Sequence, residues 1–183
     1  MKDSNNKKIK IYIILTYTGT ILSKIIKCYT KAEFCHASIA LDEDLEQIYS
    51  FGRLNPYNPF IGGFVREGID IGTFKRFKNT KAEIYSIDLS IKQYKKLVNI
   101  IKKMRRKKYL YKFNTIGLFA TAFNMKITRK NRFYCSEFVK YAIEQSRIEL
   151  DFPDIIRPND FRNIKGLTLR YRGKLRDYKG VIY

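Results

Sequence analysis

A chain of 183 residues with 45% hydrophobic residues is long enough for one substantial core and too short for two, so we expect a single domain over residues 1–183. Aromatic residues make up 15% of the chain, which excludes an intrinsically disordered protein. The formal net charge of +20 indicates either attraction to phosphates, anionic lipids or acidic polymers, or simply a biased amino-acid usage.

The cysteine and histidine content limits the possible chemistry. Three cysteines, Cys28, Cys35 and Cys135, are an odd number without paired spacing, which argues against a disulfide framework. With a single histidine, a zinc site of the usual spacing is not supported either. We therefore expect no metal and no cofactor.

The N-terminal region resembles a secretion signal only superficially. Residues 1–8 are polar and predict a flexible leader, and the apolar run 11–15 that follows is too short for a signal peptide. Nothing in the sequence approaches the ~20 apolar residues of a membrane span. We expect a cytoplasmic protein without an integral membrane segment.

In chain order, the first predicted elements are a strand, a helix and a hairpin. A β-branched and aromatic run predicts a strand over 9–17, and apolar residues at spacings of three and four predict a short helix over 20–31. Alternating residues predict a strand over 34–41, a turn at 42–44 and a returning strand over 45–52.

The segment 52–80 is rich in residues that interrupt regular secondary structure, with two prolines and five glycines. Such a connection is either a functional loop over a site or a pair of short irregular strands. The next predicted strand covers 82–89, and Ser90 is the expected N-cap of a helix over 91–108. One face of this helix is apolar and the other almost entirely Lys and Arg, which either binds phosphates or anionic lipid or is merely solvated.

The remaining elements complete an α+β pattern. The apolar segment 113–127 predicts a buried helix or part of a hydrophobic groove wall. A further helix is expected to begin at Cys135, and residues 167–178 predict a closing hairpin that turns at Gly173. This order favours an antiparallel sheet packed against helices over regular βαβ units.

Cys135 is a candidate nucleophile. A thiol reacts as the thiolate, which the positive end of a helix and nearby cations favour, and Cys135 follows Arg129, Lys130 and Arg132 at an expected helix start. His36 is the only imidazole available as a base. From the residues alone, a buried structural cysteine is the favoured alternative, because free cysteines are commonly simple buried hydrophobic residues.

The strings FCHASIALDEDLEQIYSFG and FYCSEFVKYAI, with RPNDF further on, resemble the circularly permuted branch of the NlpC-type papain-like cysteine hydrolases. This is the YiiX-like group, related to lecithin-retinol-acyltransferase-like proteins. The resemblance implies a permuted papain-like fold, with His36 at the start of a strand as general base and Cys135 as nucleophile. It also implies a third polar residue that orients the imidazole, on the strand after the histidine strand.

A turn at residues 42–44 would pair Leu41 with Leu45 and hence His36 with Ser50, which makes Ser50 the candidate third residue. A change of register by one residue would place Phe51 there instead. Relatives often carry His or Glu at this position, so a serine departs from the pattern; Glu46 is the alternative if the turn is built differently.

The resemblance further suggests Tyr17, near the end of the first strand, as a residue that borders the site and contacts substrate, and the backbone N–H of Cys135 is a natural oxyanion donor. We expect Cys28 and Cys35 to be structural.

The function expected from these features is a thiol hydrolase or acyltransferase that cleaves an amide or ester bond through a thioester on Cys135. The substrate would be a peptide, a cell-wall fragment or a lipid acyl group, and the basic surface would suit an anionic substrate or membrane surface. The alternative is a noncatalytic basic protein that binds nucleic acid or another anionic polymer.

Overall fold

The computed structural model describes residues 8–19, 32–55 and 57–180. The helix expected over 20–31, with Cys28, and most of the expected leader lie outside the described residues. The described elements are β1 (Ile9–Tyr17), β2 (His36–Ala40), β3 (Ile48–Asn55), β4 (Asn58–Glu67), α2 (Gly72–Arg76), β5 (Lys81–Leu89), α3 (Ile91–Arg106), β6 (Lys112–Phe113), α4 (Thr115–Ala122), β7 (Arg132–Phe133), α5 (Cys135–Gln145) and β8 (Thr168–Lys174), with short 3₁₀ helices at Lys108–Leu110, Pro158–Asn163 and Leu175–Asp177.

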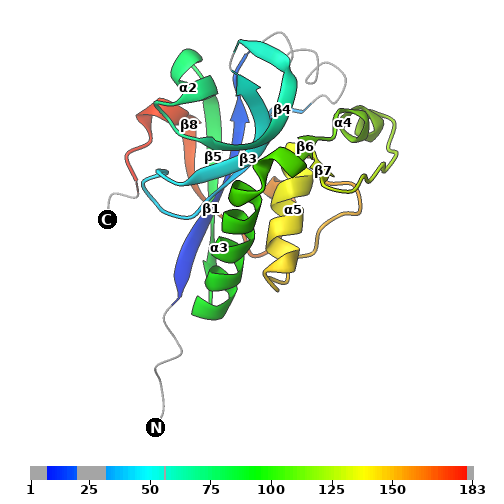
Figure 1. Cartoon of the computed structure of the whole chain (residues 1–183). Helices are drawn as coiled ribbons and strands as arrows, with labels where there is room; N and C mark the ends of the chain where they lie inside the picture. Colours follow the sequence, from blue (N-terminus) through cyan, green and yellow to red (C-terminus); the bar gives the residue numbers. More distant parts are fainter. Residues whose placement is uncertain (1–7, 20–31, 56, 181–183) are drawn as a thin grey trace.

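One eight-stranded sheet forms the centre of the described part of the chain (Figure 1). Its strand order is β7-β6-β4-β3-β2-β1-β5-β8. Neighbouring strands are antiparallel, except for the short parallel pair β6 and β7. The fold is therefore α+β, as expected, with a mixed and mostly antiparallel sheet.

The central strand β1 is buried on both faces. It pairs with β2 on one side and β5 on the other. Ile11, Ile13 and Leu15 enter one core cluster, while Tyr12 and Ile14 enter a second cluster across the sheet. This double burial explains why the strand is an almost continuous apolar run instead of an alternating one.

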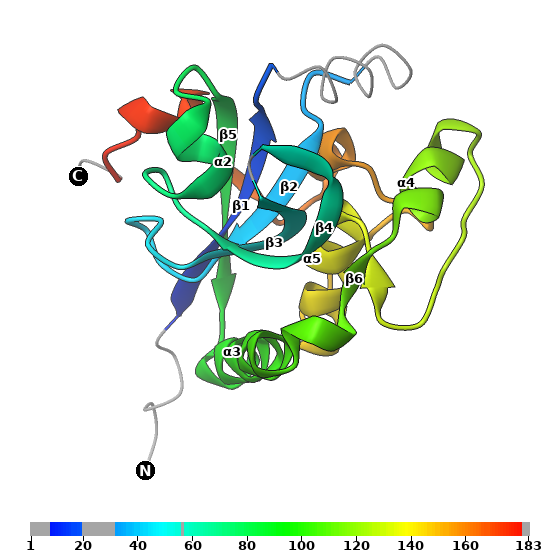
Figure 2. The same cartoon turned by 45° about the horizontal axis from the view of Figure 1, so that its top comes forward.

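Helices α3 and α5 cover one face of the sheet side by side (Figures 1 and 2). Ser90 caps α3, as predicted, in a capping box with Gln93, and Leu97 and Ile101 of this helix are buried. Helix α5 packs against β2 and β3 and contributes Phe138 to the same core cluster. The packing brings the first residue of α5 to the end of the sheet where β2 begins.

The segment 52–80 contains a pair of irregular strands, as the second alternative predicted, but β4 is long and a short helix follows it. Strand β3 continues to Asn55 and pairs with the ten-residue β4 in a long hairpin, and the short helix α2 follows. The hairpin bends forward over the sheet in Figure 2. It carries a carboxylate, Glu67, that contributes to the candidate site.

The hairpin predicted over 167–178 is wrong. Residues Thr168–Lys174 form the single strand β8, which pairs with β5, and a 3₁₀ helix follows. Gly173 lies within this strand opposite Ala82. A Cβ at Gly173 would lie 2.5 Å from the Tyr171 hydroxyl, so this glycine permits a close side-chain approach and makes no turn.

The buried helix predicted over 113–127 is also wrong. Helix α4 is short, and its buried residues are small: Gly117, Ala120 and Thr121. Large apolar side chains of this segment are exposed instead. The alternative interpretation, a groove wall, agrees with the position of Leu118 and Phe119 in the cavity described below. Among the described helices, none combines the length and apolar character required to cross a bilayer.

Candidate active site

Cys135 is the first residue of α5 and is 3% exposed. The first turn of a helix has backbone N–H groups without intrahelical partners, and it carries a partial positive charge. The next residue fixes this end of the helix, because the Ser136 hydroxyl donates a 2.9 Å hydrogen bond to the carbonyl oxygen of Ile156. The thiol therefore lies at an anchored, electropositive helix end.

His36 is the first residue of β2 and lies opposite Thr16 of β1. The backbone before it is held from two sides. The Cys35 N–H donates to the Thr16 carbonyl at 3.1 Å, and the Phe34 N–H donates to Asn159 Oδ1 at 3.0 Å. Asn159 belongs to the RPNDF segment, which thereby positions the strand that carries the imidazole.

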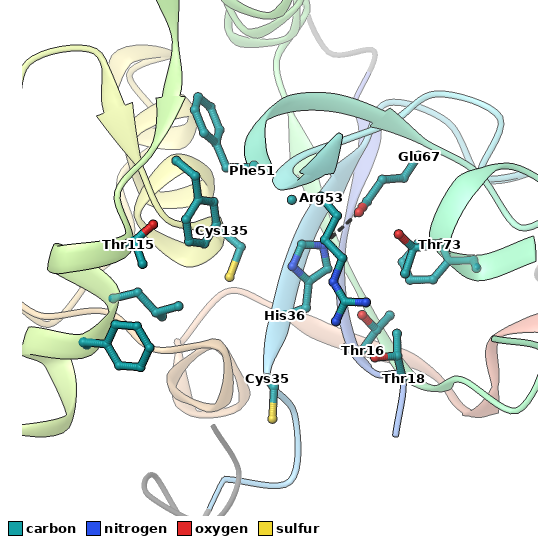
Figure 3. Close-up of a pocket in the computed structure, with 16 residues that line it drawn as sticks. Thr16, Thr18, Cys35, His36, Phe51, Arg53, Glu67, Thr73, Thr115 and Cys135 are labelled. Carbon is teal, nitrogen blue, oxygen red and sulfur yellow. Dashed lines mark hydrogen bonds and ion pairs between the residues drawn. The ribbon is translucent and has the colours of Figure 1, made fainter. Parts of the chain in front are cut away.

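Glu67, the last residue of β4, is the polar partner of His36. Its Oε1 lies 3.0 Å from His36 Nε2, and its Oε2 accepts a 2.6 Å hydrogen bond from the Ser38 hydroxyl. Figure 3 shows the imidazole between the Cys135 thiol and the Glu67 carboxylate. A thiol, an imidazole and a carboxylate thus lie next to one another in this order.

The electrostatics of this site favour a protonated imidazole. Burial acts to lower the pKa of His36, but the charge of Glu67 and hydrogen bonds to Cys135 and Glu67 outweigh it and raise the pKa to about 10. Burial acts to raise the pKa of Glu67, but His36 and the Ser38 hydroxyl hold it below its ordinary value. A cationic imidazole therefore lies beside the Cys135 thiol.

The predicted register of the β2–β3 hairpin is wrong by two residues. Ile39 pairs with Tyr49 and Ala40 with Ile48, and continuing this register places Ser38, not His36, opposite Ser50. The reason is the turn. Asp42 accepts hydrogen bonds from the backbone N–H groups of residues 46 and 47, which makes the connection longer than the predicted three residues.

The structure places neither Ser50 nor Glu46 against a ring nitrogen of His36; in the described part of the chain Glu67 takes that position. Glu46 is exposed in the turn that follows β2, whereas His36 begins the strand. Ser50 is fully buried, and its hydroxyl has no hydrogen-bond partner among the described residues. The same holds for the hydroxyl of Thr16.

Sequence reasoning missed Glu67 because the segment 52–80 had no assigned structure. A signal was nevertheless present. Glu67 and Asp70 are the only carboxylates among residues 52–80, and the resemblance implied that a glutamate is common at the third position. Assigning β4 as a strand would have placed one of these two acids at its end.

A cavity of about 200 Å³ adjoins Cys135, His36 and Glu67. Its lining is mostly apolar, with Phe51, Phe74, Phe113, Leu118 and Phe119, and its polar lining residues are Thr16, Thr18, Arg53, Thr73 and Thr115. In Figure 3, Thr115 and Cys135 lie on one side of His36 and Thr73 and Glu67 on the other. The cavity exceeds the ~150 Å³ that holds a benzene ring in a protein interior, so a short acyl chain or an aromatic group fits.

Tyr17 and Cys35 are less central to this site. Tyr17 packs against the main core cluster, and within the described residues its neighbours Thr16 and Thr18, but not Tyr17 itself, line the cavity. Cys35 lines the cavity, but its sulfur points away from His36 in Figure 3. Successive side chains of a strand point to opposite faces, which separates the Cys35 side chain from that of His36 and the Tyr17 side chain from those of Thr16 and Thr18.

Within the described ranges, no group of three or more His, Cys, Asp or Glu side chains is arranged to hold a metal ion. No protein-family model matches this chain, and no curated protein matches it. Functional interpretation therefore depends on the geometry of Cys135, His36 and Glu67.

Proposed function

We propose that this protein is a thiol hydrolase or acyltransferase with Cys135 as nucleophile, His36 as general base and acid, and Glu67 as the residue that orients and charges His36. The observation that carries the proposal is the position of the imidazole, which lies between the Cys135 thiol and the Glu67 carboxylate, with its Nε2 3.0 Å from Glu67 Oε1. Glu67 replaces Ser50 as the third member of the triad.

In the proposed reaction, the Cys135 thiolate attacks a carbonyl carbon, and backbone N–H groups at the start of α5 stabilise the oxyanion. The C–N or C–O bond of the substrate then breaks, His36 gives its proton to the leaving group, and a thioester remains on Cys135. Water or another acceptor next attacks the thioester, passes its proton to His36 and releases the acyl group, which regenerates the thiolate.

Three features support a permuted papain-like fold for this chain. The histidine precedes the nucleophile in sequence, the cysteine begins a helix that packs on a mostly antiparallel sheet, and the histidine begins a strand of that sheet. The RPNDF segment adds a structural tie through the hydrogen bond from Phe34 N–H to Asn159.

The lining of the cavity favours an apolar acyl group over a polar cell-wall fragment. Five of its residues are Phe or Leu, and burial of such a group contributes about 0.8 kcal/mol per CH₂. Arg53 also lines the cavity, and burial together with the charge of Arg76 lowers its pKa. Two neighbouring guanidinium groups suit a substrate that carries an anionic group next to its acyl chain.

The proposal is tested by trapping the acyl group. Purified protein is mixed with p-nitrophenyl butyrate at neutral pH and analysed by intact-mass spectrometry. We expect one butyryl group on the wild-type protein, located on Cys135 by peptide mapping, none on Cys135→Ser, and at least about a hundredfold slower acylation of His36→Ala, because general-base catalysis typically contributes 10²–10⁴-fold.

Denatured wild-type protein serves as the control, since it shows how an unactivated cysteine of the same chain reacts. Equal acylation rates in wild type and His36→Ala, or acylation spread evenly over Cys28, Cys35 and Cys135, would rule out an activated pair.

A further inference from the structure

Helix α4 has its large apolar side chains on the solvent side. The residues that face the protein are small, namely Gly117, Ala120 and Thr121. Ile116 and Phe119, three residues apart on this helix, are 55% and 51% exposed, and Phe123, the C-cap residue, is 76% exposed. An ordinary surface helix has the opposite arrangement.

This orientation is fixed by specific contacts. The Asn114 side chain accepts from the Gly117 N–H at 3.1 Å and donates to the Ile127 carbonyl at 2.9 Å. Arg157 donates to the Thr121 carbonyl at 2.7 Å. Because both ends of α4 are bound in this way, the helix cannot rotate to bury Ile116 and its neighbours without breaking these hydrogen bonds.

The sequence around α4 carries only cationic charges. Residues 89–136 contain 14 Lys and Arg and no Asp or Glu. Arg129 and Lys130, in the loop that follows α4, are exposed, and neither forms an ion pair within the described part of the chain. Exposed apolar groups next to unneutralised cations are typical of membrane-surface segments.

We propose that α4 and the following loop, residues 115–130, form a docking surface for an anionic lipid bilayer. Ile116 and Phe123 insert between the lipids, and Arg129 and Lys130 contact the headgroups. Figures 1 and 2 show α4 at the side of the molecule, beyond β6 and away from β8, so it is free to meet a flat surface. Phe119 also lines the cavity next to Cys135, so the docking surface adjoins the candidate site, although docking does not depend on the proposed chemistry.

The absence of tryptophan from the chain allows a direct test. Phe123→Trp places the only indole on the docking surface, and Leu169→Trp places it on an exposed residue of β8 at the opposite edge of the sheet. With vesicles of phosphatidylcholine and phosphatidylserine, we expect the indole emission of the Phe123→Trp variant to shift to the blue and to be quenched by brominated lipid. The Leu169→Trp variant should show neither.

A second pair of variants separates apolar from electrostatic contributions. Ile116→Gln/Phe123→Gln should reduce vesicle cosedimentation at least tenfold, and Arg129→Glu/Lys130→Glu should reduce it by about fivefold or more for each cation removed. The charge-matched control is Lys165→Glu/Lys174→Glu, whose residues are exposed on the β8 side, and it should bind like wild type apart from the general loss of charge.

The proposal is overturned if folded Phe123→Trp shows no blue shift with anionic vesicles. It is equally overturned if vesicles bind without a blue shift, which would indicate a purely electrostatic contact. A shift that appears without lipid as protein concentration rises would indicate a second copy of the chain as the occupant, and one that appears with an oligonucleotide but not with vesicles would indicate nucleic acid.

Discussion

The carboxylate of Glu67 is almost buried, because the residue is only 9% exposed. One of its oxygens pairs with the His36 ring, and the other accepts a hydrogen bond from the Ser38 hydroxyl. A buried charge is tolerated when it is paired and hydrogen-bonded. This arrangement fixes the ring orientation of His36 and leaves its other nitrogen for the cysteine. The charge and geometry of one residue thus determine the protonation state of its neighbour.

Glu67→Gln should lower the pKa of His36, because the charge of Glu67 is the main influence that raises it. The chain contains one histidine, so a proton NMR titration reports on His36 without overlap. Acylation of Cys135 at neutral pH should slow by about tenfold or more, within the range of general acid–base effects. Asp88→Asn, which removes an exposed carboxylate paired with Lys10, is the control. An unchanged titration of His36 in Glu67→Gln would contradict the assigned role.

Gly52 packs closely against the His36–Glu67 pair. A Cβ at this position would lie 3.3 Å from both Glu67 Oε1 and Ser50 Oγ, and 3.4 Å from His36 Cε1. Gly52→Ala should therefore displace the His36–Glu67 pair by a few tenths of an ångström and slow acylation of Cys135 severalfold, since small displacements of reacting groups are costly.

The matched control is Gly63→Ala, at the position paired with Gly52 on β4, where the new methyl group would meet the Tyr111 carbonyl and Leu54 instead. The two variants should lose similar stability, but only Gly52→Ala should change the acylation rate and the titration of His36. Equal acylation rates in both variants would mean that the crowding at Gly52 is without chemical effect.

At the scale of an element, α4 depends on close backbone packing. A Cβ at Gly117 would lie 2.2 Å from the Asn114 amide nitrogen and 2.8 Å from the Ile127 carbonyl oxygen. Alanine would normally favour a helix by about 1 kcal/mol relative to glycine. Here the clash should break the Asn114 cap, and caps are typically worth about 1 kcal/mol.

Gly117→Ala should therefore lower the free energy of unfolding by about 1–3 kcal/mol, measured by chemical denaturation, in the range found for overpacked sites. Ala122→Gly, at an exposed position of the same helix, should cost only about 0.5–1 kcal/mol from propensity. A stabilised Gly117→Ala would show that the close approach is not required.

For the whole molecule, the His36–Glu67 pair links stability to pH. The pKa of His36 rises from 6.5 to about 10 on folding, so its contribution is fully present below about pH 6.5 and is lost as the pH rises toward 10. The pKa of Glu67 is lowered on folding, so its contribution is present above about pH 4.5 and is lost as the pH falls.

The stability advantage of wild type over His36→Gln should therefore be larger at pH 6 than at pH 9. Each pKa unit corresponds to about 1.4 kcal/mol, so a difference of more than about 1 kcal/mol is expected in urea denaturation at the two values. The control is Asp88→Asn, whose stability relative to wild type should be the same at both pH values. An advantage that grows with pH would mean that the imidazole is buried in its neutral form.

Much of the local structure was predictable because its causes are local. The N-cap Ser90, the helix that begins at Cys135 and the strand that begins near His36 follow from periodicity and capping within a few residues. The β2–β3 register was not predictable to the residue, because it depended on hydrogen bonds from Asp42 that lengthen the turn. The longer turn changes the register by two residues, so that Ser38 and not His36 lies opposite Ser50.

The sequence by itself determined the α+β class, the position of Cys135 at a helix start and the position of His36 at the start of a strand. These features depend on apolar patterns and capping residues that lie within a single segment of the chain. Only the tertiary structure decided that Glu67, 31 residues from His36, is its partner, and that the large side chains of α4 face outward. Both depend on contacts between distant segments, which no local pattern of apolar and polar residues specifies.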